Sequence, residues 1–230
     1  MQLFFAADIS GQLHTLTESE SKHLIRVMRK KVGEGIQLTD GKGNLYTSFI
    51  QNANPKKCVL EITSKEFQKK LLKREIHIAI APTKSNDRLE WFVEKATEIG
   101  VSSITPIICE HSERAKLNEN RLQRVCIGAM KQANRFHLPS IQPVTSYADF
   151  IKSDESENKL IAHCLNDDKK NLTEIELGGS VSVLIGPEGD FSLNEIEAAI
   201  KSDYLAVSLG KSRLRTETAG LTACTLLNSF

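Results

Sequence analysis

Residues 181–201 read VSVLIGPEGDFSLNEIEAAIK, and this stretch decides the fold class. Its first part, 181–186, is mainly apolar and predicts a short strand. Ser192 and Glu195 then stand three residues apart at the start of an amphipathic run, which is the capping-box pattern of a helix start. A strand followed closely by a helix is the repeating unit of a parallel α/β sheet, so the stretch predicts that class.

The same alternation continues along the chain on both sides of this stretch. Residues 76–81, IHIAIA, form a continuous apolar run typical of a strand that is buried on both faces. Further strands are predicted at 104–108, 159–164 and 205–210, and helices at 88–100, 120–136, 192–201 and from Thr216 onward. Residues 73–230 are therefore predicted to form one α/β domain with a mostly parallel sheet.

The first 72 residues show a different pattern, rich in strands. Strands are predicted at 3–8 and 56–66, and a hairpin at 33–53 turns at Asp-Gly-Lys-Gly, residues 40–43. One helix is predicted at 18–28. This pattern predicts a small barrel-like domain over 1–72, with a boundary near residues 71–75.

Composition and charge narrow the class of protein. The 230-residue chain has five scattered cysteines without zinc-site spacing, so we expect reduced core thiols, a cytoplasmic protein and no metal. No apolar run could cross a bilayer, and the N-terminus does not read as a signal peptide, so we expect no membrane partner. The net charge is +1, but basic residues gather at 22–31 and 65–75. These two basic segments indicate either a nucleic-acid contact or ordinary solvent-exposed faces.

The loop at 184–192 follows a predicted strand, at the sheet edge where ligands of open parallel sheets bind. Gly186 and Gly189 allow a backbone that presents donors and acceptors to a flat ligand such as adenine. The loop is neither a Walker loop nor GxGxxG, and Glu188 and Asp190 would repel a phosphate but not a cationic cofactor. A tight strand–helix turn without a ligand is the alternative.

A second loop, within SLGKSRLRTETAGLTA at 208–223, also follows a predicted strand. Arg213 and Arg215 precede Glu217 at the start of the final helix. A carboxylate in the first turn is favoured by the helix dipole, but the two arginines oppose it. The arginines therefore predict an anionic ligand.

Together, LIGPEGDFSLNEIEAA and SLGKSRLRTETAGLTA resemble the paired motifs of the uracil-N3 methyltransferases of 16S ribosomal RNA, in the knotted SPOUT class of S-adenosylmethionine enzymes. The resemblance covers the whole chain. HLIRVMRKKVGEGIQLTDGKG is similar to the family's PUA-like RNA-binding domain, and MKQANRFHLPSI resembles its Gln-Arg-Pro stretch. The chain departs from the pattern at Gln2 and Leu3, where a basic residue is usual, at Asp190, where many members have glycine, and at Ser212.

The resemblance implies a trefoil-knotted SPOUT domain after an N-terminal PUA-like β-barrel, in a homodimer. It implies S-adenosylmethionine as cofactor, held by Leu184, Ile185, Gly186, Glu188, Gly189, Leu209, Gly210, Ser212 and Leu214. The implied substrate is 16S ribosomal RNA or the small ribosomal subunit. Its proposed contacts are Lys22, Arg26, Arg29, Lys30 and Arg135.

The implied reaction transfers a methyl group to uracil N3, which must lose its proton. Arg213 or Arg215 would stabilise the charge that develops on the ring oxygens. Glu217 would accept the proton or orient an arginine, and both roles stay open. Because N3 lies on the Watson–Crick edge, the uridine must be unpaired or flipped out. A knotted ribose 2′-O-methyltransferase and a non-catalytic RNA-binding protein are the alternatives.

Overall fold

The computed structural model describes residues 3–70, 74–165 and 169–229. The chain divides into two compact units, of which the first comprises residues 1–71 with 130–138 and the second comprises 72–129 with 139–230. The predicted boundary at residues 72 and 73 lies outside the described residues. None of the helices in the described part of the chain is long and apolar enough to cross a membrane.

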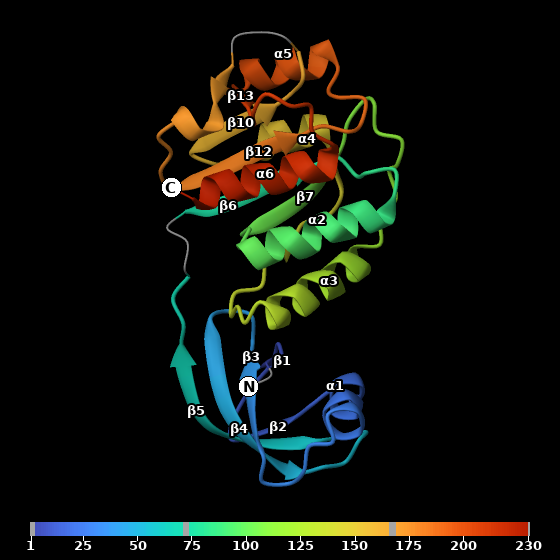
Figure 1. Ribbon diagram of the computed structural model, residues 1–230, viewed down its shortest axis with the longest axis vertical. Helices are drawn as coiled ribbons and strands as arrows, with labels where there is room; N and C mark the ends of the chain where they lie inside the picture. The colour runs from blue at the N-terminus through green and yellow to red at the C-terminus, as the bar shows by residue number, and fades with distance from the viewer. Residues whose placement is uncertain (1–2, 71–73, 166–168, 230) are drawn as a thin grey trace. The chain divides into compact units, whose positions relative to one another are not determined.

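A curled five-stranded sheet forms the first unit (Figure 1). Its strands are β1 (Leu3–Phe5), β2 (Leu13–Thr15), β3 (Gly35–Thr39), β4 (Asn44–Asn52) and β5 (Val59–Phe67), in the order β1-β3-β4-β5-β2. The predicted turn at 40–43 joins β3 to the antiparallel β4, because Asp40 Oδ1 accepts hydrogen bonds from the Lys42 and Asn44 amides at 2.8 and 3.3 Å. Phe4, Leu38 and similar apolar side chains fill the core of the unit.

The helix predicted over 18–28 consists of two segments. The α-helix α1 spans Glu18–Lys22 and continues as a π-helical turn over His23–Val27. Thr17 caps α1, and Leu24 of the turn is fully buried in the core of the unit. The short strand β2 was not predicted, because three residues are too few to show an alternating pattern.

Residues 130–138 belong by their contacts to the first unit. The Gly43 amide donates to the Phe136 carbonyl at 2.8 Å, and the Leu138 amide donates to the Gly41 carbonyl at 2.8 Å. In sequence the segment lies within the predicted α/β domain. Helix α3 (Glu119–Gln132) ends before the predicted residue 136, and Asn134 follows with a φ of +53°.

The second unit contains an eight-stranded sheet, and every pairing among its described strands is parallel, as predicted. The order is β11-β13-β10-β12-β6-β7-β8, with β9 beside β7. The strands are β6 (Glu75–Ile80), β7 (Ser103–Ile108), β8 (Ser140–Ile141), β9 (Thr145–Ser146), β10 (Asn158–Ala162), β11 (Lys170–Asn171), β12 (Ser180–Ile185) and β13 (Leu205–Ser208).

Helices cover both faces of this sheet (Figure 1). Helices α4 (Tyr147–Ser153) and α5 (Leu193–Lys201) pack with Ala79 on one face. Helices α2 (Asn86–Ile99) and α6 (Thr216–Asn228) pack on the other, where Gly220 lies against Phe92 and Ile80. Neighbouring strand residues point to opposite faces, so the continuous apolar run of β6 serves both helix layers.

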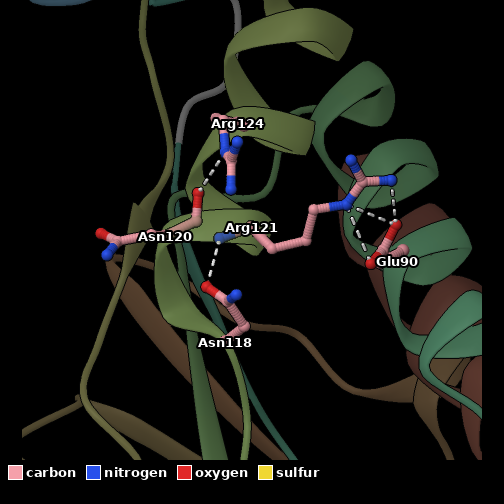
Figure 2. Close-up of polar contacts among 5 residues, drawn as sticks. All are labelled: Glu90, Asn118, Asn120, Arg121 and Arg124. Carbon is pink, nitrogen blue, oxygen red and sulfur yellow. Dashed lines mark hydrogen bonds and ion pairs between the residues drawn. The ribbon is translucent and has the colours of Figure 1, made fainter.

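Helix α3 is joined to α2 by an ion pair at its N-terminal end (Figure 2). Arg121 Nε donates to both oxygens of Glu90 at 3.1 Å, and Arg121 Nη2 donates to Oε2 at 2.9 Å. Asn118 Oδ1 accepts from the Arg121 amide at 3.0 Å. This two-pronged contact holds the first turn of α3 beside α2.

Candidate functional site

Two adjoining cavities lie at the carboxyl ends of β10, β12 and β13. One, of about 350 Å³, is lined by the loop after β12 and by the start of α6. The other, of about 520 Å³, is lined by the ends of β10 and β13 and by residues 209–214. They share Ala162, Cys164, Arg213, Leu214 and Ala219. The two cavities therefore lie at the sheet edge where the sequence predicts ligand binding.

Asp190 shapes the loop after β12. Its φ is +65°, in the left-handed region that glycine adopts readily. Its Oδ2 accepts from the Cys164 amide at 2.7 Å, and its Oδ1 accepts from the Phe191 amide at 2.9 Å. The predicted capping box of Ser192 and Glu195 then starts α5. One carboxylate thus ties the β12 loop to the end of β10 beside the cavities.

Glu188, the other carboxylate of this loop, is exposed and braces a neighbouring loop. Its Oε1 accepts from the Lys84 amide at 3.0 Å. The guanidinium of Arg114 donates to the Lys84 carbonyl at 2.8 Å and to Asn86 Oδ1 at 2.5 Å. The loops that follow β6, β7 and β12 therefore support one another at the same sheet edge.

Seven of the nine residues predicted to hold a cofactor line the cavities, namely Ile185, Gly186, Glu188, Leu209, Gly210, Ser212 and Leu214. Leu184 instead points into the core beneath α4 and α5. Gly189 lies against His111, and a Cβ at Gly189 would come within 3.1 Å of the Cβ of that histidine. Gly210 has a φ of +133°, so a side chain at this position would strain the backbone.

The two arginines of the second loop lie at the cavities, as their charge pattern indicates. Arg213 lines both cavities, and Arg215 lines the smaller one as the N-cap residue of α6. Both side chains are exposed, and within the described part of the chain neither lies at ion-pair distance from a carboxylate. Thr216 Oγ1 donates to the Gly186 carbonyl at 3.0 Å and so joins the two loops.

Glu217 lies apart from these arginines. Its side chain is 8% exposed, and its Oε1 lies 3.8 Å from Nε of Arg88 in α2. Its Oε2 is buried and has no hydrogen-bond partner among the residues that the structure describes. Arg88 was not predicted, because the motif that contains Glu217 gives no sign of a partner more than a hundred residues earlier in the chain.

Cys164 differs from the expectation that the cysteines are core residues. Cys58, Cys109, Cys126 and Cys224 are buried, whereas Cys164 is exposed at the end of β10 and lines both cavities. Burial, and then the charge of Asp190, raise the pKa of the Cys164 thiol, although Arg213 acts in the opposite direction. The thiol is therefore neutral near pH 7 and a poor nucleophile.

The basic residues proposed for RNA contact lie in the first unit. Lys22 Nζ is 2.7 Å from Glu18, and Lys30 Nζ is 2.6 Å from Glu34, so part of the cationic charge is offset locally. Arg26 and Arg29 are exposed. Arg135 lies in the segment 130–138, where burial lowers the pKa of its guanidinium.

A further cavity of about 590 Å³ lies at the opposite ends of the strands, near His77 and Asp154. The carboxylate of Asp154 is already used, because its Oδ2 accepts from the hydroxyls of Ser182 and Tyr204, and Glu155, the other carboxylate of this cavity, is exposed. No cluster of three or more side chains suited to a metal ion occurs among the described residues. The cavities beside β10, β12 and β13 therefore remain the candidate site.

These cavities suit a ligand that combines a flat apolar group with charges of both signs. Ala162, Ile185, Leu214 and Ala219 supply apolar wall. The exposed arginines offer cations and Glu188 offers a carboxylate, so the ligand's charged ends can be matched.

Comparison with known proteins agrees with this geometry. A family model described as an RNA methyltransferase domain matches residues 70–228, and one described as an RNA methyltransferase PUA domain matches residues 16–63. The ribosomal RNA small subunit methyltransferase E of Aquifex aeolicus is 30% identical over the full length of both chains. That of Rickettsia conorii is 26% identical over 90% of this chain and 86% of its own.

Solved structures give the same result. A probable rRNA methyltransferase from Porphyromonas gingivalis superposes with a TM-score of 0.94 at 39% identity, covering 100% of this chain and 98% of its own. The ribosomal RNA small subunit methyltransferase E of Neisseria gonorrhoeae, bound to S-adenosyl methionine, superposes with a TM-score of 0.91 at 29% identity, over 100% and 97% of the two chains. The chain therefore belongs to the RNA methyltransferase family that includes ribosomal RNA small subunit methyltransferase E.

Proposed function

We propose that this chain uses S-adenosylmethionine to methylate N3 of a specific uridine in the 16S RNA of the small ribosomal subunit. The observation that carries the proposal is the pair of cavities at the ends of β10, β12 and β13, where two exposed arginines lie beside the apolar side chains of Ala162, Ile185, Leu214 and Ala219. The Neisseria gonorrhoeae relative, which has the same fold, was solved with S-adenosyl methionine bound.

The residues of the cavities suit this cofactor. Ile185, Gly186 and Leu214 would hold the adenine ring, and Glu188 would face its cationic groups. When bound, S-adenosylmethionine supplies a methyl group already activated by the sulfonium. The protein then has to hold the uracil in line and favour the loss of its N3 proton.

Arg213 and Arg215 are proposed to perform the second task. Without carboxylate partners in the described part of the chain, their charge is available to a ligand. Loss of the N3 proton spreads negative charge over the two ring oxygens, and a guanidinium stabilises that charge. Glu217 does not line either cavity, so we propose that it acts by orienting an arginine rather than by accepting the proton.

The first unit is proposed to bind the RNA around the target. Lys22, Arg26, Arg29, Lys30 and Arg135 are its proposed contacts. Contacts of this kind go mainly to phosphates, so they position the substrate and weaken with salt. The uridine must be unpaired or flipped out to expose N3.

We also propose a C-terminal trefoil knot, a homodimer and a cytoplasmic location. After β13 at one side of β10, the chain crosses the sheet edge and becomes α6, which packs on β6 and β12. This crossing beside the β12 loop supports the proposed knot.

The free thiols and a ribosomal substrate both support a reducing, cytoplasmic compartment.

Calorimetric titration of the purified protein with S-adenosylmethionine, ATP and NAD tests the cofactor. We expect saturable binding of S-adenosylmethionine alone, weakened about tenfold or more in Gly210→Val, because strain of roughly 1–3 kcal/mol is placed in the cavity wall. Gly33→Val is the matched control, since Gly33 has a φ of +85° and open space but lies in the first unit. Absence of S-adenosylmethionine binding would contradict the proposal.

Incubation with small ribosomal subunits that lack the modification tests the reaction. Nucleoside analysis by mass spectrometry is expected to show 3-methyluridine. A ribose-methylated nucleoside would indicate the knotted 2′-O-methyltransferase instead. Binding of RNA without any methyl transfer would indicate a non-catalytic RNA-binding protein.

A further inference from the structure

Arg88 lies at the edge of the candidate site but outside both cavities. It belongs to the first turn of α2, directly after the loop that follows β6. It is linked to the cavities through α6, because Thr216 binds the Gly186 carbonyl and its neighbour Glu217 approaches Arg88. Arg88 is therefore placed one helix away from the wall of the site.

The guanidinium of Arg88 is held at one side and open at the other. Its Nε lies 3.8 Å from Glu217 Oε1, and the Arg88 side chain is 43% exposed, against 8% for Glu217. Within the described part of the chain, its two Nη groups have no carboxylate at ion-pair distance. The buried carboxylate thus approaches the Nε side of the guanidinium and can orient it, which leaves the Nη groups for another anion.

The position of Arg88 needs an anion. A cation in the first turn of a helix interacts unfavourably with the helix dipole. The carboxylate of Glu217, 3.8 Å from Nε, offsets this only in part. Two other cations beside the start of α2 are already engaged: Lys84 Nζ is 2.9 Å from Glu113, and Arg114 donates to Asn86 and to the Lys84 carbonyl. Arg88 is therefore the cation at the start of α2 with donors left for a ligand.

We propose that Arg88, oriented by Glu217, binds a backbone phosphate of the substrate RNA beside the reacting nucleotide. A planar guanidinium with two free Nη groups matches phosphate geometry. The cofactor's carboxylate is a less suitable partner, because Arg213 and Arg215 line the cavities and Arg88 does not. The inference rests on the proposed RNA methylation.

The test compares Arg88→Ala and Arg88→Lys with Arg124→Ala, in the full-length protein with unmodified small ribosomal subunits. Arg124 is a matched control because its Nε is also occupied, by the Asn120 carbonyl at 3.2 Å (Figure 2), and because its side chain is exposed. Arg88→Lys keeps a cation beside Glu217, so it guards against misfolding from an uncompensated buried charge.

We expect both Arg88 variants to raise the KM for subunits by about tenfold, with little change in kcat, because a charged hydrogen bond is lost. The slope of log(kcat/KM) against log salt concentration should become shallower by about 0.7 to 0.9 in Arg88→Ala, and should change little in Arg88→Lys, which keeps the charge. The Kd for S-adenosylmethionine, measured by calorimetry, should stay as in the wild type.

Equal behaviour of the Arg88 variants and Arg124→Ala would overturn the inference while leaving the methylation itself intact. A parallel loss of S-adenosylmethionine affinity would assign Arg88 to the cofactor, and dissociation into monomers on light scattering would assign it to a second copy of the chain. If the wild type methylates no RNA, the proposed function fails first.

The positioning role of Glu217 is tested with Glu217→Gln alone and in the Arg88→Lys background. If Glu217 acts only through Arg88, Glu217→Gln by itself should raise the KM. In the Arg88→Lys background, Glu217→Gln should raise the KM little further, since the two changes remove one interaction. A fall in kcat that persists in the double variant would show that Glu217 acts on the reaction itself.

Discussion

Single carboxylates, those of Asp190 and Asp154, hold the second unit together at two places. Asp190 occupies a left-handed position usual for glycine and accepts from two backbone amides. Asp154 is buried and accepts from the Tyr204 hydroxyl at 2.5 Å and the Ser156 amide at 3.1 Å, as well as from Ser182. Both residues link segments that are distant in the chain, so replacing either one should lower the stability of the unit as a whole and not only of the local turn.

Asp154 yields a prediction about pH. Burial alone would raise the pKa of its carboxyl, but hydrogen bonds from Ser182, Tyr204 and Ser156 outweigh burial and lower that pKa below its ordinary value of 3.8. The ionised carboxylate therefore stabilises the fold above the unfolded-state pKa, and this contribution is lost as pH falls through the lower folded-state pKa. Asp154→Asn should lower the free energy of unfolding by roughly 1.5–3 kcal/mol at pH 7.

Urea unfolding at pH 7 and at successively lower pH measures this effect. The deficit of Asp154→Asn relative to wild type should shrink as the solution becomes more acidic than about pH 4. Glu155→Gln, an exposed neighbour, serves as control and should change stability by less than about 0.5 kcal/mol. A deficit independent of pH would show that the charge of Asp154 is not what stabilises the unit.

At the scale of elements, helix α6 depends on close approach to α2 and β6. Gly220 in α6 lies so near its neighbours that a Cβ would come within 2.7 Å of the Phe92 ring and 3.0 Å of Ile80 Cδ1. Glycine normally weakens a helix interior relative to alanine, so its presence here reflects packing rather than helix propensity. Because α6 also presents Arg215 and Thr216 to the site, its packing and the site are linked.

Gly220→Ala should therefore destabilise the protein by about 1–3 kcal/mol, through overpacking. Gly128→Ala in α3 is the matched control, since a Cβ at Gly128 meets nothing within 4 Å. It should stabilise by roughly 0.5–1 kcal/mol, the ordinary gain from replacing a helical glycine. Thermal unfolding of both variants measures the contrast, and an equal gain in Tm would argue against tight packing of α6.

At the scale of the whole molecule, the chain enters the first unit twice. Strands β1 to β5 build the sheet, and residues 130–138 return to cover the turn between β3 and β4. A Cβ at Gly41 would come within 2.8 Å of Leu138 Cβ, which shows how closely the returning segment lies. The first unit is therefore complete only with a segment from the middle of the sequence.

An excised fragment of residues 1–70 should consequently be less stable than one that carries 130–138 through a flexible Gly/Ser linker. The linked fragment regains the hydrogen bonds of Gly43 with Phe136 and of Leu138 with Gly41. If these contacts contribute about 1 kcal/mol, its Tm should be about 4–8 °C higher. Scanning calorimetry measures both fragments, with a linker bearing a scrambled 130–138 as control; equal Tm values would mean that the segment adds nothing.

The sequence alone determined the features that depend on neighbouring residues. The apolar run of β6, the capping box at Ser192 and the turn at 40–43 each follow from local periodicity or backbone preference. The loops of the site were also predicted from glycines and charge. The resemblance of the two C-terminal motifs then led to the correct family.

The contacts between distant parts of the chain could be known only from the three-dimensional structure. It brings Cys164 to the loop after β12, sets Glu217 beside Arg88 rather than beside the arginines of its own motif, and returns residues 130–138 to the first unit. Helix α4 also escaped prediction, although Ser146 and Asp149 could have signalled its start. Contacts of this kind arise when strands far apart in the chain pair in one sheet, and a local pattern carries no record of that pairing.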